Sequence, residues 1–512
     1  MSRKILFVCE STLVGLSIIA LCAYFFVAFS RIAFPFSLEW IEANTYLHVL
    51  RVLQHKLIYI PPSYDFTPMI YTPLYYYVVS VFATITGQIM LSMRLVSILA
   101  SVLIFVVIYA LCRVRKIPPL VSLLAVGLFA TSYAVTGYWF DIGKVDSLFL
   151  ALLLTGYLLS IVRTKRDNAV GVFAGFILFL SIATKQQALL AIPFVLFHLI
   201  LERRWMKTLW LGISLLISGI VFVVAMNIAT KGWFWFYVYE VPATFQISWE
   251  MILHSFWTQY IFPKYPWLIL LFFIAVVVLL TGRNRKDIFY HGLFVITFFL
   301  PLSAMSIVSM AHQWGWINTL LPMVAALSVL GAEAYQLVAA TVKSNHTIAW
   351  IQIGLCCLAS VLMIFQFLIL RYDYRTQIPT SINLESGYRI LDVIKKLKSP
   401  VFIPSSPYLL FMDDQTTHFQ VSSLGDLYLA GQRNPEILRS SKQYLDRISS
   451  YLLSKSIQTA ILPNAIWYDK VFSMENGYKC ESLVVDHPPL ITVTGSIMYL
   501  DRICRLQGKI TK

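Results

Sequence analysis

Long apolar runs of about 20 residues recur along most of the chain, and they constrain its fold more than any other feature. A run of this length is what a helix needs to cross the hydrocarbon core of a bilayer. The composition agrees, because 58% of the 512 residues are hydrophobic and 13% are charged, whereas about a quarter of the residues in soluble domains are charged. The sequence therefore predicts a polytopic α-helical membrane protein and excludes intrinsic disorder, a collagen-like fibre and a soluble multidomain enzyme.

We predict about eleven spanning helices within a membrane domain of residues 1–370. The expected spans are 5–30, 90–112, 117–138, 145–162, 168–184, 187–201, 208–229, 266–281, 288–308, 317–341 and 347–370. Residues 73–87 are apolar but short for a span, so we interpret them as an interfacial or re-entrant helix. The first apolar run has no small-residue cleavage site after it, which predicts a retained first helix instead of a signal peptide.

The charges indicate how the helices are oriented. The chain has 40 Lys and Arg against 25 Asp and Glu, a net charge of +15. Clustered cations fall in alternate connections: Arg3 and Lys4; Arg113, Arg115 and Lys116; Arg163, Lys165 and Arg166; Arg203, Arg204 and Lys207; Arg283, Arg285 and Lys286; and Lys343. The positive-inside rule places these connections and the N-terminus in the cytoplasm, and the long aromatic loops and the C-terminus outside. Since topology accounts for the cations, no nucleic-acid partner is expected, and we favour a bacterial inner membrane.

The composition changes at Arg371, and residues 371–512 form a predicted second domain. Strand-like VFIP, HFQVSS, TAILP and LITVTG alternate there with helical GYRILDVIKKLK and SKQYLDRISSYLLS, a pattern typical of a small α/β domain. The topology places it outside the cytoplasm, as a cap that guides substrate or stabilises the protein. Cys480 and Cys504 are the two cysteines in polar sequence, and in an oxidising compartment they could form a disulfide.

The first external loop is rich in acids and aromatic residues. Glu39, Glu42 and Asp65 lie in it, and we expect a helix from about Glu39 to Lys56 whose apolar positions suit the membrane surface. Carboxylates three residues apart share a helix face, so Glu39 and Glu42 could converge on one site. The alternative is that they stabilise the start of the helix, where acids are favoured.

A second set of charges lies at the outer ends of predicted spans. Asp141, Lys144 and Asp146 directly precede one span, and Lys185 lies beside two glutamines near the end of another. Insertion of an acid at membrane depth costs about 2.5–3.5 kcal/mol, so such residues are rarely incidental. Lys144 could form an internal ion pair, whereas Lys185 is a candidate ligand for a phosphate.

These features occur in a definite order: an acidic first external loop, YTPLYYY, RLVS with Arg94, DIGKVDSLFLAL and ATKQQALLAIP. The ordered set resembles the C-type membrane glycosyltransferases, in the branch of the dolichyl-phosphate-mannose protein mannosyltransferases and the lipid A aminoarabinose transferases. The resemblance covers about the first 200 residues, continues loosely through HSFWTQYIFPKYPWL and HQWGWINTLLP, and hardly extends to the C-terminal domain. It implies a hexosyl- or pentosyltransferase that uses a polyprenyl-phosphate sugar and a lipid, glycan or protein acceptor.

The resemblance also implies roles for individual residues. The catalytic acid of the first loop maps onto Glu39 or Glu42, where this chain has EWIE in place of the usual Asp-Glu pair, and the second-loop acid maps onto Asp146. The implied ligands of the donor phosphate are Lys185, Lys144 and Arg94. Further candidate contacts to the substrate or a metal are Asp141, Asp65, Tyr71, His254 and His312.

Elementary chemistry agrees with this set. A carboxylate can take the proton of the acceptor as its oxygen attacks the anomeric carbon, and cations can stabilise the departing phosphate. Direct displacement would invert the configuration; if the acceptor is itself a phosphate, the glutamate would orient it instead. A carboxylate site could also hold Mg²⁺ or Mn²⁺, although the chemistry does not require a metal. The alternative functions are a transporter or lipid-linked sugar flippase, and a non-catalytic membrane subunit.

Overall fold

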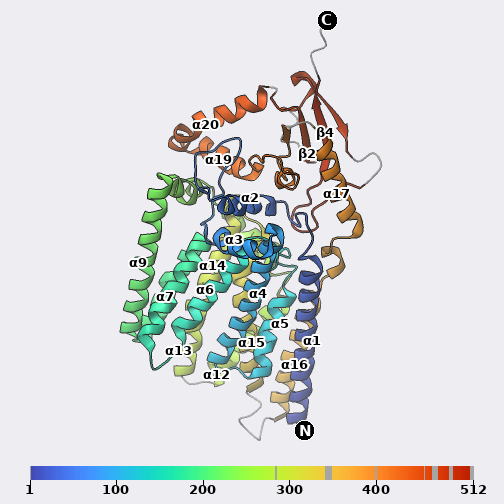
Figure 1. The fold of residues 1–512 in the computed structure, drawn as a ribbon. Coiled ribbons are helices and arrows are strands. Elements are labelled where there is room, and N and C mark those ends of the chain that lie inside the picture. The colour runs from blue at the N-terminus through green and yellow to red at the C-terminus, as the bar shows by residue number, and fades with distance from the viewer. Residues whose placement is uncertain are drawn as a thin grey trace.

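The computed structural model describes residues 2–282, 285–340, 349–397, 400–454, 456–463, 471–483 and 488–507. The molecule consists of a long helical bundle and a smaller domain of helices and strands. The N-terminus lies at one end of the bundle, and the smaller domain covers the other end (Figure 1). The architecture predicted from the sequence, a helical membrane protein with a small α/β domain, is confirmed. The cytoplasmic loop expected around Lys343 lies outside the described residues.

The bundle is built from the long apolar segments. Its helices are α1 (Ser2–Arg31), α4 (Ile89–Val114), α5 (Pro119–Thr131), α6 (Asp146–Ile161), α7 (Asp167–Thr184), α8 (Ile192–Leu201), α9 (Trp205–Thr230), α12 (Pro266–Gly282), α13 (Arg285–Phe294), α14 (Leu300–Ala311), α15 (Leu321–Ala340) and α16 (Ala349–Ile369). One continuous apolar core joins them, with residues such as Tyr24, Phe129 and Leu150 fully buried. Helix α9 stands at the edge against α7, and 6% of its most apolar stretch is buried (Figure 1).

Length limits which helices can cross a bilayer alone. Among the described residues, six helical segments are long and apolar enough: Phe7–Arg31, Ile89–Val114, Asp167–Thr184, Trp205–Thr230, Arg285–Ala311 and Ile317–Ala339. Two bent helix pairs raise the number to eight if each pair is one span. Each of the eleven predicted spans coincides with a helix or a run of helical segments, but several are short, so the count of eleven stays a prediction.

Two short helices lie across the end of the bundle that faces the C-terminal domain (Figure 1). Helix α2 spans Glu42–Leu53 and α3 spans Leu74–Thr86, where Gly87 ends the helix with a φ of 71°. The predicted helix of the first loop therefore begins three residues later than expected. Glu39 lies before it, so Glu39 and Glu42 do not share a helix face, which corrects that expectation.

The chain between α9 and α12 also stays at this end of the bundle. It contains two π-helical segments, η2 (Phe236–Glu240) and η3 (Met251–Ile261), joined by the short α11 (Val241–Ala243). A third π-helical segment, η4 (Val295–Phe299), joins α13 to α14. Because π-helical turns are rare and widen the helix locally, they re-aim the side chains that follow.

The C-terminal domain is a four-stranded sheet with helices. The strand order is β1-β2-β4-β3, where β1 (Val401–Phe402) is parallel to β2 (Thr459–Pro463), and β4 (Leu500–Leu506) is antiparallel to both β2 and β3 (Tyr478–Ser482). Its main helices are α17 (Ser381–Lys396), α18 (Tyr408–Phe411), α19 (Val421–Arg433) and α20 (Pro435–Leu453).

The strand predictions for this domain were half right. VFIP and TAILP contain β1 and β2, and both predicted helical runs lie in α17 and α20. HFQVSS instead leads into α19, because Gln420 caps that helix by accepting a hydrogen bond from the Ser422 backbone N–H. LITVTG forms an isolated bridge from Ile491 to Tyr499. The polar strands β3 and β4 were missed because their charged residues alternate poorly with apolar ones.

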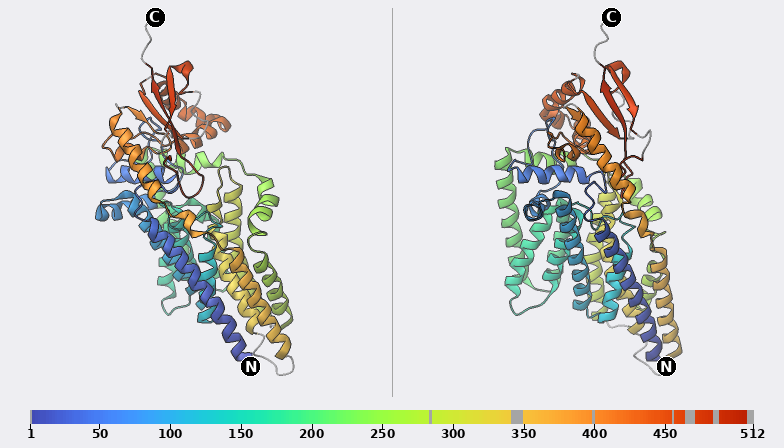
Figure 2. Two further views of the ribbon diagram at one scale, coloured as in Figure 1. Left: turned by 90° about the vertical axis from the view of Figure 1, so that its right-hand side faces the viewer. Right: turned by 45° about the vertical axis from the view of Figure 1, so that its right-hand side comes forward.

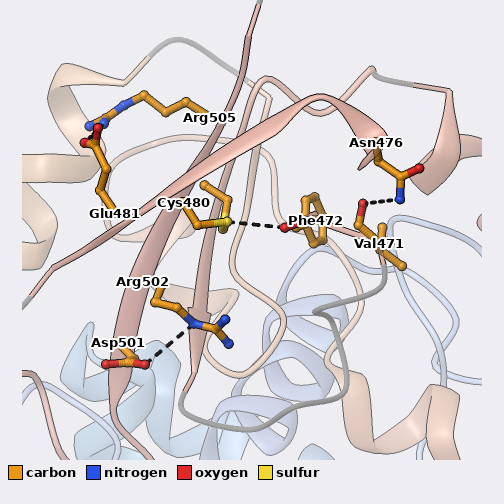
Figure 3. Close-up of a disulfide and its surroundings, with 9 residues drawn as sticks. Val471, Phe472, Asn476, Cys480, Glu481, Asp501, Arg502 and Arg505 are labelled. Atoms are coloured by element: carbon orange, nitrogen blue, oxygen red, sulfur yellow. Dashed lines mark hydrogen bonds and ion pairs between the residues drawn. A yellow bond between two sulfur atoms is a disulfide. The ribbon is translucent and has the colours of Figure 1, made fainter. Parts of the chain in front are cut away.

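A disulfide joins β4 to the neighbouring edge strand β3. Cys480 of β3 and Cys504 of β4 are directly opposite in the antiparallel register, and they are bonded to each other (Figure 3). Arg505 and Glu481 form an ion pair next to the disulfide, with a distance of 3.2 Å (Figure 3). The predicted pairing of the two cysteines is thus present in the structure.

The C-terminal domain is packed onto the loops of the bundle and shares a core with them. A second apolar cluster combines Phe36 and Leu47 of the first loop with Ile390, Leu409 and Leu427 of the domain. The two further views show the domain and α2 in the same close arrangement (Figure 2).

Candidate active site

A buried ion pair joins the second external loop to the outer end of α7. Lys185 Nζ lies 2.7 Å from Asp146 Oδ1, and Asn318 donates to the same oxygen at 3.0 Å. Asp146 begins α6, Lys185 follows α7, and Asn318 lies in the short η5 helix (Ile317–Leu320). Three distant segments therefore meet at one carboxylate, which fixes the direction of the Lys185 ammonium group.

A second lysine lies beside this pair without a carboxylate in contact. Lys144 is 2% exposed, and among the described residues its ammonium group has no ion pair or hydrogen bond. The Lys144 Nζ lies 5.4 Å from the ring centre of Tyr71 and 5.6 Å from that of Trp139. Lys185 Nζ lies 5.8 Å from the same Tyr71 ring. Burial, together with the neighbouring Lys185, lowers the pKa of Lys144 although nearby acids oppose the shift.

Glu39 has fewer hydrogen-bond partners than Glu42, Asp141 or Asp146. It is 1% exposed, and among the described residues its one hydrogen bond is from the Ile41 backbone N–H at 2.9 Å. Burial raises the pKa of Glu39 to about 8, and the attraction of Lys144 opposes that rise. A carboxyl group whose pKa lies near neutral pH can accept and release a proton under physiological conditions.

Glu42, by contrast, is fully occupied by protein donors. Its carboxylate accepts hydrogen bonds from Arg94 Nη2 at 2.9 Å, Arg94 Nε at 3.2 Å, Leu38 N at 2.7 Å and Gly143 N at 2.6 Å. These donors outweigh burial and lower its pKa. The Arg94 guanidinium group also donates hydrogen bonds to backbone carbonyl oxygens, including that of Phe36 at 2.7 Å. Neither side chain has capacity left for a ligand in this arrangement.

A second buried ion pair connects the first helix with the second external loop. Arg31, the last residue of α1, donates to both oxygens of Asp141 at 2.7 and 2.8 Å and to the Tyr133 hydroxyl at 2.6 Å. It also reaches the C-terminal domain through Thr494 Oγ1 at 2.8 Å. The alternative of an ion pair between Asp141 and Lys144 is not what the structure contains, since Asp141 pairs with Arg31.

Two glycines allow close packing around the first and second external loops. A Cβ on Gly143 would lie 2.8 Å from Met93 Cβ, so the turn between Asp141 and Lys144 packs tightly against α4. Gly495 of the C-terminal domain has a φ of 72°, and a Cβ there would lie 2.8 Å from Glu39 Cγ. The backbone of the C-terminal domain therefore forms part of the wall against which Glu39 rests.

This contact leads to a prediction for Gly495→Ala. The added methyl group must displace Glu39, and displacement of a reacting group by about 1 Å can lower a rate about 100-fold. Gly477→Ala is the matched control, because Gly477 has a similarly positive φ of 86° but lies in the hairpin before β3. We expect Gly495→Ala to lose at least tenfold in activity relative to this control; equal activities would contradict the contact.

Several buried polar atoms of residues near or next to the lysines have no hydrogen-bond partner among the described residues. They are the indole nitrogen of Trp139, Oε1 of Gln186 and Nε2 of Gln187. Buried polar groups are normally paired, so unpaired ones gathered beside two lysines indicate a place for a polar ligand or water.

The other predicted contacts lie apart from this cluster. Asp65 lines a cavity of about 330 Å³ together with Tyr64 and Tyr451, at the boundary between the first loop and the C-terminal domain. His254 is exposed on η3. His312 is half-buried, packs against Phe245 and approaches the Pro242 carbonyl oxygen at 3.2 Å, and burial lowers its pKa.

The carboxylates of this site do not form an evident binding site for the Mg²⁺ or Mn²⁺ that the sequence left open. Within the described parts of the chain, no three His, Cys, Asp or Glu side chains come together as a metal-binding group. Asp146 is committed to Lys185 and Asn318, and Glu42 is committed to Arg94. The donor set therefore does not fit a divalent cation, and the chemistry below uses none.

Sequence reasoning missed three residues that shape the site. Arg31 ends an apolar span, which is a detectable signal, but its partner Asp141 lies 110 residues away. Asn318 and Gly495 have no local signal, since a lone amide or glycine in a loop is common. Their roles depend on long-range contacts that spacing does not reveal.

Comparison with known proteins extends these observations. Residues 70–229 match the model of the dolichyl-phosphate-mannose-protein mannosyltransferase family. No curated protein sequence matches the chain.

The fold of almost the whole chain is shared with solved structures of ArnT from Cupriavidus metallidurans. The structure bound to undecaprenyl phosphate has a TM-score of 0.59 and 11% identity, covering 97% of this chain and 99% of that one. The apo structure has a TM-score of 0.58 and 12% identity, covering 96% and 97%. This coverage includes the C-terminal domain, which the sequence resemblance hardly reached. Residues 70–229 are thus similar to the dolichyl-phosphate-mannose-protein mannosyltransferases, and the chain as a whole shares the fold of ArnT.

Proposed function

We propose that this chain is a C-type membrane glycosyltransferase that moves a hexosyl or pentosyl group from a polyprenyl-phosphate carrier to a lipid, glycan or protein acceptor outside the cytoplasm. The observation that supports this most directly is the pair Lys144 and Lys185, set around Tyr71 with Glu39 and unpaired polar atoms nearby. The similarly folded ArnT has been solved with undecaprenyl phosphate bound, which supports a carrier of this class.

The carrier phosphate would bind between the two lysines. Lys185 is held in place by Asp146, while Lys144 has no carboxylate in contact within the described parts of the chain. A unit negative charge at 4 Å from a cation contributes about 4 kcal/mol at an effective dielectric of 20. A phosphate would therefore relieve the repulsion between the lysines, and the Trp139 N–H could donate to it. In this proposal Asp146 positions Lys185, and Arg94 stabilises the loop instead of contacting phosphate.

Glu39 is the proposed base. The acceptor oxygen attacks the anomeric carbon, the bond from that carbon to the phosphate oxygen breaks, and its electron pair leaves with the polyprenyl phosphate. The acceptor proton passes to the Glu39 carboxylate, and the lysines stabilise the charge that develops on the phosphate. A single displacement inverts the anomeric configuration. Glu42 cannot take this part without losing the four hydrogen bonds that fill its carboxylate.

The proposed orientation places the N-terminus in the cytoplasm and this site outside, in a bacterial inner membrane. The disulfide between Cys480 and Cys504 supports it, because disulfides persist in oxidising compartments such as the periplasm. The clustered cations point the same way, since they favour the cytoplasmic side.

Lys144→Met tests the phosphate site. The substitution keeps the apolar length of the side chain and removes its charge, so we expect the Kd for undecaprenyl phosphate to rise about 10- to 100-fold. Lys144→Arg should restore part of the affinity. Lys165→Met, in an exposed loop at the other end of the bundle, is the control and should bind as the parent does. Unchanged binding by Lys144→Met would exclude Lys144 as a phosphate ligand.

The class of acceptor can be determined by analysing the cell envelope of cells that produce the protein. Mass spectrometry of envelope lipids and glycans should show one sugar modification that is present with the parent chain and lost with Glu39→Gln. Transport of a lipid-linked sugar by proteoliposomes without a covalent product would instead support the flippase alternative.

A further inference from the structure

Helix α19 of the C-terminal domain spans the loops that surround the lysines. At its N-terminal end, Ser422 and Ser423 accept hydrogen bonds from Asn44 Nδ2 of α2 at 3.0 and 2.7 Å. At its C-terminal end, Arg433 donates to Gln313 Oε1 in the loop between α14 and η5. The helix is thus fixed at both ends to two different external loops, and it lies over α2 in Figure 1.

The middle of this helix contains an acid that the mechanism above does not use. Asp426 lies three and four residues after Ser423 and Ser422, so it follows them on the helix face that meets α2. Its neighbour Leu427 is fully buried in the apolar core shared with the external loops. Among the described residues, Asp426 has no hydrogen bond or ion pair.

The charge of Asp426 acts on the same two residues that surround the proposed phosphate site. It attracts the ammonium group of Lys144 and disfavours ionisation of the Tyr71 hydroxyl. Burial raises the pKa of Asp426 to about 7, and Lys144 opposes that rise. Lys144 therefore has an unpaired acid from each domain in its surroundings, Glu39 from the first loop and Asp426 from α19.

We propose that Asp426 contacts the transferred sugar, so that the C-terminal domain supplies a substrate-binding carboxylate to the reaction centre. The inference rests on the proposed function and adds a specificity-determining residue to it. Glu39 and Asp426 lie near one lysine, and among the described residues neither forms an ion pair with it, so a ligand placed between them would meet both carboxylates. The hydroxyl and amino groups of a sugar are the donors that such carboxylates bind, while the lysines take the phosphate.

Asp426→Asn separates this role from a structural one. The probes are undecaprenyl phosphate without sugar and undecaprenyl phosphate loaded with mannose, glucose or aminoarabinose. For the loaded carrier that the parent transfers, we expect KM to rise about 10- to 100-fold for Asp426→Asn, with the Kd for the bare carrier within twofold of the parent. Asp446→Asn, an exposed acid on α20 of the same domain, is the control and should leave both values unchanged.

Each other outcome has a distinct meaning. An unchanged KM would overturn the proposal, and so would an equal rise in KM and in the Kd for the bare carrier, because the residue would then act on the phosphate. A lower melting temperature with loss of both activities would show a structural role and also overturn it. If the parent binds the bare carrier but transfers none of the three sugars, the proposed donor class fails, and the inference about Asp426 fails with it.

Discussion

Glu39→Gln should abolish most glycosyl transfer while leaving the protein folded. General base catalysis contributes about 100- to 10,000-fold to a rate, and a glutamine amide cannot accept the acceptor proton. The substitution keeps an oxygen that can accept the hydrogen bond from Ile41 N, so the melting temperature in detergent should stay close to that of the parent. The measurement is the rate of sugar transfer by purified protein, with binding of undecaprenyl phosphate measured in parallel.

The pH dependence gives an independent check on Glu39. The base must be ionised, and its pKa is raised to about 8, so kcat/KM should increase as the pH rises through this value. Lys144 must stay protonated to bind phosphate, and its pKa is lowered, so the activity should fall again at higher pH. A bell-shaped profile is therefore expected. A Glu39→Gln enzyme with activity within a few-fold of the parent would mean that the base lies elsewhere or that the acceptor needs none.

Glu42→Gln, in contrast to Glu39→Gln, should mainly lower the stability of the folded protein. The Glu42–Arg94 pair is fully buried, with side-chain exposures of 0% and 1%, and removing one partner of such a pair costs about 3–5 kcal/mol because the remaining charge stays buried. We expect a marked fall in the melting temperature and in the yield of monodisperse protein. Transfer per folded molecule should fall much less than for Glu39→Gln.

The matched control is Glu385→Gln. Glu385 forms an ion pair with Arg389 four residues later on α17, but its side chain is 62% exposed, and exposed pairs contribute about 0–1 kcal/mol. The melting temperature of Glu385→Gln should therefore match that of the parent. If Glu42→Gln were as stable as Glu385→Gln and inactive, Glu42 and not Glu39 would be the catalytic acid.

Features of the fold and the site that depend on neighbouring residues could be predicted from the sequence, whereas those that depend on contacts between distant residues could not. The bundle helices follow from local apolar runs, so their positions were predictable within a few residues, as α7 (Asp167–Thr184) shows against the expected 168–184. Lys185 and Asp146 stood out because charge at membrane depth is costly, and the structure brings them to 2.7 Å. The choice between Glu39 and Glu42 was not predictable, because it depends on Arg94 and Gly143, which lie 52 and 101 residues from Glu42.

The C-terminal domain shows the same limit more strongly. Its amphipathic helices were predictable, but the short sheet was not, since β1 has two residues and β3 alternates weakly. Asp426 and Gly495 matter only because α19 and the loop before β4 are packed onto the first external loop. No local pattern encodes that docking, which brings Gly495 of a domain expected to be a cap against Glu39.

The partners of Arg31 also set the order in which the molecule can be assembled. Its guanidinium group contacts Asp141, the Gln377 carbonyl oxygen and Thr494, which lie 110, 346 and 463 residues further along the chain. The hydrogen bonds of this residue at the end of α1 are therefore complete only after the last part of the chain has been synthesised and packed. The Gly495 contact with Glu39 forms in the same late step. Under the proposed function, we therefore expect a chain truncated before Thr494 to lack both the complete partner set of Arg31 and the wall against which Glu39 rests.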